Sequence, residues 1–464
     1  MNKKIDHKEL FRMLLFLLTA AACMLTFALV MPFGDGPDEI NRYKIVDFIF
    51  KHGGLPAGQN PEVLIAGYGA SYAFQPMLTY IIDGYLLRAL SFLSLTLLEQ
   101  VFISRCVNIC FGLIMAIYVR KISKLLFSDS RLAWAFTLAV VFLPQNLFVH
   151  SYVNTDSMGF LSVAIIIYAM ILGTRDDYSL KACLNLAAGV ILCALSYYNC
   201  YGIVLCAVIL FLFHFLKKQT DAEGKVHNVY DYASLLKKGG LITLLVLLGI
   251  SWWFIRNALL YNGDFLALDA RKICAASTCR EEYNPFTRDT YASLGTPVFD
   301  MIFKTDYYTL VWKSFIAMFG PMLIPTHHYI YMSFKYLCIF SLIGLILPIA
   351  SPDLTGFNKR QRISLRLIMG LAALIPALLA VYYSYTWEFQ PQGRYFLPLL
   401  IPLMYFLSIG IGKIFSLPDK YLAKKQPRAN ELLTSFMYHV LYLFLTASLL
   451  YSVFVSFLKY YKVY

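Results

Sequence analysis

Long apolar runs alternate with short polar segments along the whole chain. A run of about 17 to 25 apolar residues is long enough to cross a bilayer as a helix. We expect transmembrane helices at residues 11–31, 98–119, 131–150, 157–173, 183–199, 201–216, 240–257, 334–350, 365–384, 395–414 and 434–457. The pattern therefore predicts an all-α polytopic membrane protein, a single domain over residues 1–464 with about 11 transmembrane helices.

The first external loop, residues 32–97, is expected to carry two helices that lie on the membrane surface. In its first half, Ile40, Tyr43 and Phe50 recur at roughly helical spacing, and Gly53-Gly54 would end the helix. The stretch 73–95 is apolar enough to resemble another span, but a proline and several polar residues interrupt it: Gln75, Pro76, Asp83 and Arg88. We therefore expect a second surface helix there.

Clusters of Lys and Arg between the apolar runs predict the orientation. They lie at the start of the chain (Lys3, Lys4, Lys8 and Arg12) and at residues 120–124, 217–218, 237–238, 359–362 and 420–428, and with the spans above all of them face one side. That side is the cytoplasm, so the N-terminus is expected inside and the C-terminus outside. The first run lacks a small-residue cleavage pattern, which indicates a retained anchor. The second large external loop, 256–333, is too long for a simple connector and indicates a lid or cap.

Composition narrows the class of protein further. The chain is 59% hydrophobic and only 14% charged, and its formal net charge is +13. Because the basic residues occur in short clusters between apolar runs, we exclude nucleic acid as a partner. Most cysteines lie inside apolar runs, but Cys274 and Cys279 lie in the second external loop, where an oxidising environment would permit a disulfide. A zinc site is disfavoured because the pair has no nearby histidines.

Three carboxylates, Asp35, Asp38 and Glu39, crowd the end of the first span. Carboxylates beside a bilayer are costly unless water, a cation or a reaction keeps them there, so they are candidate catalytic residues. The alternative is an ordinary helix start, with Pro37 at the first helical position and acidic residues in the first turn. Two adjacent helical residues point about 100° apart, so only Asp38 or Glu39 would face a cavity.

Further polar residues are expected on the same face, after or before later spans: His150, Asn154, Asp156, Arg256, Gln392, Glu388 and Arg394. Arg394 and Arg256 are candidates to bind a donor phosphate, because a guanidinium pairs with phosphate oxygens in a bidentate way. The alternative for both is an interfacial anchor at a helix end. The alternative for Asp156 is a helix cap.

Six motifs appear in order along the chain: PDEINRY, QPMLTY, YVNTDSMG, SWWFIRNALLYNGD, SFIAMFG and QGRYFLPLLIPL. Together they resemble a bacterial family of multi-span proteins within the GT-C glycosyltransferase superfamily, which includes protein mannosyltransferases and lipid A aminoarabinose transferases. The resemblance implies a GT-C-like fold and a sugar donor carried on polyprenyl phosphate. It also implies an acidic catalytic group at Asp38 or Glu39. Where many relatives have a basic residue before a Pro-Pro pair, this chain has Gln75-Pro76-Met77, so a phosphate contact is absent or moved.

These observations predict an integral-membrane glycosyltransferase in the cell membrane, with its active site on the extracytoplasmic side. A carboxylate would deprotonate the acceptor and cations would stabilise the departing phosphate. The acceptor would be a glycan, lipid or protein of the cell envelope, and the protein would contact membrane lipid. A divalent metal that bridges carboxylates and phosphate is left open. The alternatives are a transporter or flippase of a lipid-linked sugar and a non-catalytic assembly partner.

Overall fold

The computed structural model describes residues 7–220, 225–422 and 425–463. Its α-helices are α1 (His7–Val30), α2 (Glu39–His52), α3 (Leu78–Ala89), α4 (Leu97–Leu126), α5 (Ser130–Val141), α6 (Pro144–Val149), α7 (Asp156–Asp176), α8 (Leu180–Ala194), α9 (Tyr201–Phe215), α10 (Tyr232–Leu260), α11 (Leu268–Thr278), α12 (Val298–Phe303), α13 (Tyr307–Ile316), α14 (His328–Ile346), α15 (Lys359–Thr386), α16 (Leu400–Phe415), α17 (Leu417–Leu422), α18 (Pro427–Leu450) and α19 (Leu458–Val463). The basic residues Lys3, Lys4 and Lys424, used above to predict orientation, lie outside the described residues.

Short helical turns and two small hairpins complete the fold. The turns are η1 (Tyr72–Phe74), η2 (Ser91–Leu93), η3 (Tyr198–Cys200), η4 (Glu281–Tyr283), η5 (Gly393–Leu399) and the π-helical η6 (Tyr451–Phe457). Strand β1 (Leu216–Thr220) pairs antiparallel with β2 (Val226–Tyr230), and β3 (Met318–Phe319) pairs with β4 (Ile324–Pro325).

Within the described residues, nine helices are long and apolar enough to cross a membrane. They are α1, α4, α7, α10, α14, α15 and the continuous helical segments η3–α9, η5–α17 and α18–α19. The shorter apolar helices α5 and α8 coincide with the two remaining expected spans. The predicted class, an all-α polytopic membrane protein, is therefore confirmed.

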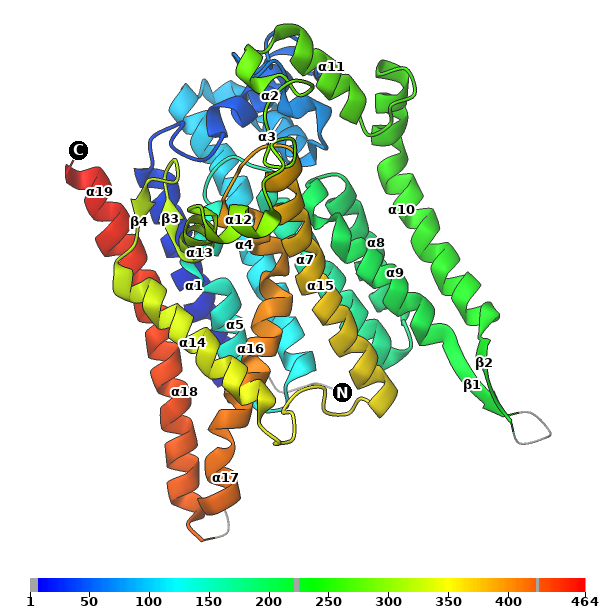
Figure 1. The fold of residues 1–464 in the computed structure, drawn as a ribbon, viewed down its shortest axis with the longest axis vertical. Coiled ribbons are helices and arrows are strands. Elements are labelled where there is room, and N and C mark those ends of the chain that lie inside the picture. Colours follow the sequence, from blue (N-terminus) through cyan, green and yellow to red (C-terminus); the bar gives the residue numbers. More distant parts are fainter. Residues whose placement is uncertain (1–6, 221–224, 423–424, 464) are drawn as a thin grey trace.

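The two ends of the helix bundle differ. Helices α2, α3 and α11 gather at one end, whereas hairpin β1–β2 and α17 project from the opposite end (Figure 1). Helices α2 and α3 are 14 and 12 residues long and share a small core that includes Val46, Ile49, Tyr80 and Trp253. These two short helices match the pair expected in the first external loop.

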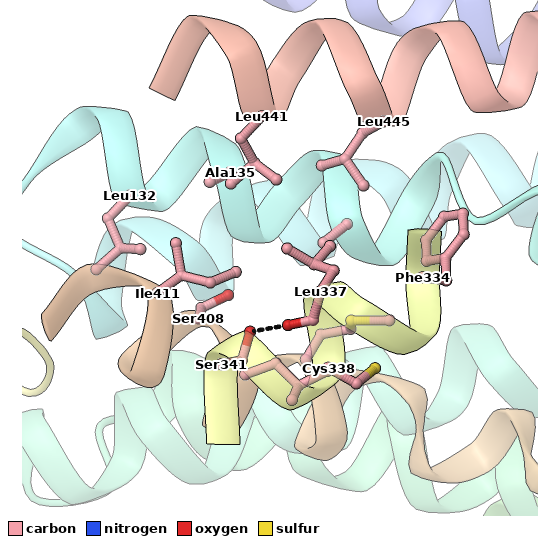
Figure 2. Close-up of a pocket in the computed structure, with 13 residues that line it drawn as sticks. Leu132, Ala135, Phe334, Leu337, Cys338, Ser341, Ser408, Ile411, Leu441 and Leu445 are labelled. Carbon is pink, nitrogen blue, oxygen red and sulfur yellow. Dashed lines mark hydrogen bonds between the residues drawn. The ribbon is translucent and has the colours of Figure 1, made fainter. Parts of the chain in front are cut away.

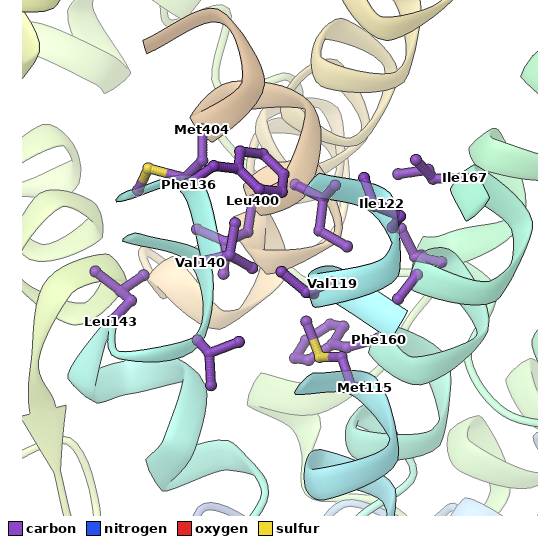
Figure 3. Close-up of a cluster of buried hydrophobic side chains, with 14 of the residues drawn as sticks. Met115, Val119, Ile122, Phe136, Val140, Leu143, Phe160, Ile167, Leu400 and Met404 are labelled. Atoms are coloured by element: carbon purple, nitrogen blue, oxygen red, sulfur yellow. The ribbon is translucent and has the colours of Figure 1, made fainter. Parts of the chain in front are cut away.

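The main core fills the space between α4, α5, α7 and α16, where Val119, Phe136, Phe160 and Leu400 are buried against one another (Figure 3). Helix α7 is buried along most of its length, whereas α10 lies at the periphery with its leucines exposed. A cavity of about 20 Å³ lies between α5, α14, α16 and α18 and is lined mainly by apolar side chains (Figure 2). The candidate active-site residues do not line it.

The basic clusters at residues 217–218 and 237–238 belong to hairpin β1–β2 and to the first turns of α10. Asp231 caps α10 by accepting from Ser234 N at 3.2 Å. The expected start of the first surface helix was wrong. Helix α2 begins at Glu39 rather than at Pro37. Asp38 precedes it with a left-handed backbone (φ 62°) and makes no side-chain cap hydrogen bond. The ordinary helix-start explanation therefore does not account for the Asp38 carboxylate.

Candidate active site

The Asp38 carboxylate lies at the start of α2 and faces two arginines. Its Oδ2 atom is 2.8 Å from Arg394 Nη2 and 4.0 Å from Arg42 Nη2. The side chain is 35% exposed, so it is accessible from outside the protein, whereas both arginines are buried. Because a non-glycine residue with φ above zero is strained, the arginine contacts help to hold Asp38 in this conformation.

Two sequence motifs meet to position Arg394. Gly393 N donates to Ser314 Oγ at 2.6 Å, which joins QGRYFLPLLIPL to SFIAMFG. A Cβ atom at Gly393 would lie 2.0 Å from Phe315 N, so only glycine permits this approach. Arg394 Nη2 also donates to Tyr395 Oη at 3.2 Å. Arg394 Nε and Nη1 are buried and have no hydrogen-bond partner among the described residues.

A second ion pair lies beneath the first. Arg42 Nη1 is 3.1 Å from Asp156 Oδ1, and both side chains are buried. The guanidinium of Arg42 also lies 4.9 Å from the ring centre of Tyr72. Arg42 Nε and Asp156 Oδ2 are buried without a partner in the described part of the chain. The site therefore presents donors and an acceptor that a ligand could satisfy.

Glu39 is fully buried and serves a different purpose. Its Oε1 atom accepts from Arg105 Nε at 2.8 Å and from Val153 N at 3.1 Å, while Oε2 accepts from Arg105 Nη2 at 2.6 Å and Gly34 N at 3.2 Å. Arg105 donates further to the carbonyls of Ala28, Met31 and Pro32 at 2.7 to 3.2 Å. The pair ties α4 to the end of α1, the first loop and the turn before α7.

Arg105 and Arg42 contact the candidate carboxylates Glu39, Asp38 and Asp156, although neither arginine was predicted as a site residue from the sequence. Arg105 is a lone arginine inside the apolar run 98–119, and an ionisable residue within a span is itself a signal of a site or a structural partner. Arg42 follows Asp38 by one helical turn, a spacing that brings the two side chains to one face.

The Asp38 pKa reflects these contacts. Burial alone would raise it, but the charges of Arg394 and Arg42 and the hydrogen bonds from Arg394 and Tyr72 outweigh burial. The pKa of Asp38 is therefore lowered below its ordinary value, and the carboxylate is ionised at neutral pH.

Some other predicted residues hold the site together. Asn154 Oδ1 accepts from Ser157 N at 2.9 Å and so caps α7, while its Nδ2 donates to the carbonyls of Val149 and Tyr152. His150 is buried, with Nε2 3.3 Å from Met115 Sδ. Neither side chain faces Asp38 directly.

The remaining candidates near the first loop have separate surroundings. Asp35 Oδ2 accepts from Tyr461 Oη at 2.9 Å, and Glu388 Oε2 accepts from Tyr68 Oη at 2.6 Å. Gln392 precedes Arg394 and its Oε1 is buried without a partner among the described residues. Gln75 is half-buried and ends η1.

Arg256 lies outside the Asp38–Arg394 group. Its Nη2 donates to the carbonyls of Leu55 and Pro56 at 3.3 and 2.8 Å, and its guanidinium lies 5.4 Å from the Trp253 ring centre. These contacts anchor the loop after α2.

The disulfide that the second external loop would permit between Cys274 and Cys279 is not formed in this structure, where both are free thiols. Cys274 lies within α11 and its Sγ donates to Gly69 O at 3.4 Å, whereas Cys279 caps the helix end.

A divalent metal centre needs several oxygen, nitrogen or sulfur ligands that converge on one point. Among residues 7–220, 225–422 and 425–463, no group of three or more His, Cys, Asp or Glu could hold a metal ion. Asp38 and Asp156 are each paired with arginine, which already supplies the positive charge that a metal would bring. The residues present therefore do not fit a metal centre.

A family model described as "Predicted membrane protein (DUF2142)" matches residues 65–403, which is more than half of the chain. The chain belongs to the DUF2142 family. The matched region of this DUF2142 protein contains Arg105, Asp156 and Arg394, and the Asp38 loop precedes it. No curated protein sequence matches the chain.

Two solved structures of an archaeal oligosaccharyltransferase share the fold, and a third solved structure has a lower TM-score. The oligosaccharyltransferase AglB of Archaeoglobus fulgidus, in complex with an inhibitory peptide and a dolichol-phosphate, is 12% identical with a TM-score of 0.52, covering 96% of this chain and 56% of AglB. The apo form of the A. fulgidus oligosaccharyltransferase is 13% identical with a TM-score of 0.53, covering 94% and 56%. ArnT of Cupriavidus metallidurans, bound to undecaprenyl phosphate, is 12% identical with a TM-score of 0.49, covering 94% and 77%.

The chain thus spans 56% of the length of AglB. At 12 to 13% sequence identity, the similarity to AglB shows that the two proteins share a fold and shows nothing about activity. It confirms the GT-C-like fold that the resemblance of the motifs implied.

Proposed function

We propose that this DUF2142 protein is a membrane glycosyltransferase that moves a sugar from a polyprenyl-phosphate donor to a cell-envelope acceptor at the outer face of the cytoplasmic membrane. The GT-C-like fold supports this reaction class, and the AglB structure of the same fold contains a dolichol-phosphate. Asp38 directly precedes α2, and α2 lies with α3 at one end of the bundle (Figure 1). A site at one end favours an enzyme over a transporter, which needs a path between both ends.

One observation carries the proposal: the contact between Asp38 and a buried arginine with spare donors. Arg394 Nε and Nη1 have no partner among the described residues, although burying unsatisfied donors of a charged group costs free energy. A phosphate oxygen near Arg394 would satisfy them, and Arg42 would add a second positive charge. The lipid chain would then extend into the bilayer beside the helices.

The reaction needs one base and one leaving group. The acceptor hydroxyl or amine attacks the anomeric carbon while Asp38 takes its proton. The bond between that carbon and the phosphate oxygen breaks, and the electron pair leaves with the lipid phosphate. Arg394 and Arg42 stabilise the negative charge that develops there. A single displacement inverts the anomeric centre and requires no covalent sugar–enzyme intermediate.

Donor binding would activate Asp38. In the free protein, Arg394 pairs with Asp38 at 2.8 Å, and this contact lowers its pKa. A phosphate dianion or diester beside Arg394 competes for the same guanidinium and adds a nearby negative charge. Both effects raise the pKa of Asp38 and make it a stronger base when the donor is present.

The sugar itself would contact the buried polar atoms that remain. Asp156 Oδ2 can accept from a sugar hydroxyl, and Gln392 Oε1 offers a second acceptor. Asp35, Glu388, Gln75, His150 and Asn154 stay predictions as substrate contacts. Because the arginine-paired carboxylates do not fit a metal centre, no step is assigned to a metal.

Native mass spectrometry of the protein purified in mild detergent tests the proposal. The wild-type protein should retain a lipid with the mass of a polyprenyl phosphate, and Arg394→Ala should lose it. Arg280→Ala is a matched control, since its side chain is 74% exposed and pairs with Glu282. Equal retention of that lipid by Arg394→Ala, or only ordinary phospholipid on the wild type, would contradict the assignment.

A further inference from the structure

A second group of charged and aromatic side chains adjoins the candidate active site, where the loop between α10 and α14 meets the segment before η5. We call it the cap cluster and define it as Tyr68, Arg271, Lys272, Arg288, Tyr383, Trp387 and Glu388. Tyr383 lies within electrostatic reach of Tyr395, whose hydroxyl accepts from Arg394. The cluster is therefore connected to the Asp38 site through two tyrosines.

Arg288 is the most informative member. Its side chain is only 9% exposed, yet its guanidinium makes no hydrogen bond within the part of the chain that the structure describes. Nη1 lies 3.8 Å from Glu388 Oε2, which is too long for a hydrogen bond, and Cζ lies 5.3 Å from the Trp387 ring centre. A guanidinium has five N–H donors, so Arg288 retains donors for a ligand.

Two more cations approach from α11. Lys272 Nζ lies 5.1 Å from the Trp387 ring centre. Arg271 lies close to Tyr68, Tyr198 and Tyr383, and it forms no ion pair with any other described residue. Arg271 and Lys272 are consecutive residues, so both charges enter the cluster from one turn of helix.

The cluster has an excess of positive charge. Its single carboxylate, Glu388, already accepts a hydrogen bond from Tyr68 Oη at 2.6 Å. The pKa of Tyr68 is raised by burial and by the Glu388 carboxylate, while Arg271 opposes the increase. Lys272 Nζ also lies 3.7 Å from Asp269 Oδ1, so the excess positive charge comes from Arg271 and Arg288. These two arginines face one carboxylate, Glu388, that is hydrogen-bonded to a neutral phenol.

We propose that the cap cluster binds an anionic group of the acceptor, and that the acceptor is an acidic glycan. This inference rests on the proposed function, because it concerns the second substrate of the same reaction. Arginine binds carboxylate and phosphodiester oxygens by the same paired hydrogen bonds, and aromatic rings pack against the apolar faces of a ligand. The position of the cluster would bring the bound glycan next to Asp38.

Calorimetric titration of the full chain in a neutral detergent tests this assignment. Three oligomers of equal length serve as probes: an oligogalacturonate with carboxylates, an oligo(glycerol phosphate) with phosphodiesters, and a neutral maltooligosaccharide. At least one anionic oligomer should bind at least about tenfold more tightly than the neutral one. Arg271→Gln and Arg288→Gln should each weaken that binding by about tenfold, whereas Arg280→Gln in the same loop should leave it unchanged.

Equal affinity for all three oligomers would overturn the inference. It would also be overturned if Arg280→Gln weakened binding as much as Arg271→Gln, since that result shows only general attraction to a basic protein. If Arg288→Gln fails to fold, the half-exposed Arg271 still decides the question. Asp38→Asn should bind the anionic oligomer normally, so retained binding together with a wild-type rate of transfer contradicts the proposed reaction and not the cap cluster.

Discussion

Asp38 and Glu39 are consecutive residues, yet their carboxylates are held by arginines from different parts of the chain. Asp38 Oδ2 is 2.8 Å from Arg394 Nη2, and Glu39 Oε2 is 2.6 Å from Arg105 Nη2. Asp38 is 35% exposed on its side chain and Glu39 is fully buried. The exposed carboxylate is therefore the candidate base, and the buried one holds the first loop in place.

The first prediction concerns stability. Removing one partner of the Glu39–Arg105 pair leaves a buried charge uncompensated, so Glu39→Gln or Arg105→Ala should lower the free energy of unfolding by roughly 3 to 5 kcal/mol. Thermal unfolding in detergent measures the effect. Asp47→Asn is the matched control, because Asp47 forms a more exposed pair with Lys51 on the same helix. An unfolding temperature of Glu39→Gln equal to that of Asp47→Asn would disprove the structural role.

The second prediction distinguishes the roles of Arg394 and Arg256, the two arginines that the sequence analysis gave as candidates to bind the donor phosphate. Arg394→Ala should reduce donor affinity or turnover by an amount equivalent to roughly 2 to 5 kcal/mol, and Arg394→Lys should restore only part of it. Arg256→Ala should act mainly on stability, since Arg256 donates to the carbonyls of Leu55 and Pro56. Kinetics with a synthetic polyprenyl-phosphate sugar provide the measurement. If the two alanine variants lost donor affinity equally, the assignment of Arg394 alone would be incorrect.

The fold was largely predictable from the sequence, because long apolar runs and short basic clusters report spans directly. The eleven expected spans coincide with the apolar helices of the structure. The π-helical turn Tyr451–Phe457 and the hairpin β1–β2 were not predicted, since neither changes the hydrophobic pattern of its neighbours.

The candidate site was harder to predict in detail. The sequence nominated Asp38 and Arg394, but it contained no information on which carboxylate pairs with which arginine. Arg105 lies 66 residues after Glu39, and the pairing depends on how α4 packs against α1. Arg256 and Asn154 were predicted to contact substrate because of their positions at the ends of apolar runs. In the structure their side chains instead donate hydrogen bonds to backbone carbonyls.

The third prediction is a pH dependence with a defined sign. The pKa of Asp38 is lowered in the free protein, so its ionised form is retained as pH falls through the ordinary aspartate value of about 3.9. Stability from its pairing is fully present above that value and is lost as pH falls through the lowered, folded-state pKa. Protonation of Asp38 should lower kcat/KM at acid pH, and because the pKa of Asp38 in the free protein is lowered, this decrease should lie below about pH 4.

The acid limb of kcat should lie at higher pH, because bound phosphate competes for Arg394 and raises the Asp38 pKa in the complex. Stopped-time transfer assays across the acid range give both profiles. Identical acid limbs for kcat and kcat/KM would contradict donor-dependent activation of Asp38.

The fourth prediction is the orientation of the chain. Single cysteines at Asn60 and Lys425, in a variant without the native cysteines, should react differently with a membrane-impermeant maleimide applied to intact cells. Position 60 follows α2 and should be labelled from outside, and position 425 lies beside α17 and should be protected until the membrane is opened. Labelling of position 425 in intact cells would invert the topology and move the site to the cytoplasmic face.

The account depends most on Asp38 as the base, and Asp38→Asn tests it directly. The substitution keeps the size of the side chain while it removes basicity, so the protein should fold with wild-type thermal stability within about 1 kcal/mol. Transfer of sugar from a polyprenyl-phosphate donor by the purified protein should fall by roughly 10²-fold or more, while donor retention persists. A folded Asp38→Asn variant that transfers sugar at the wild-type rate would show that Asp38 is not the base, and the proposed mechanism would be wrong.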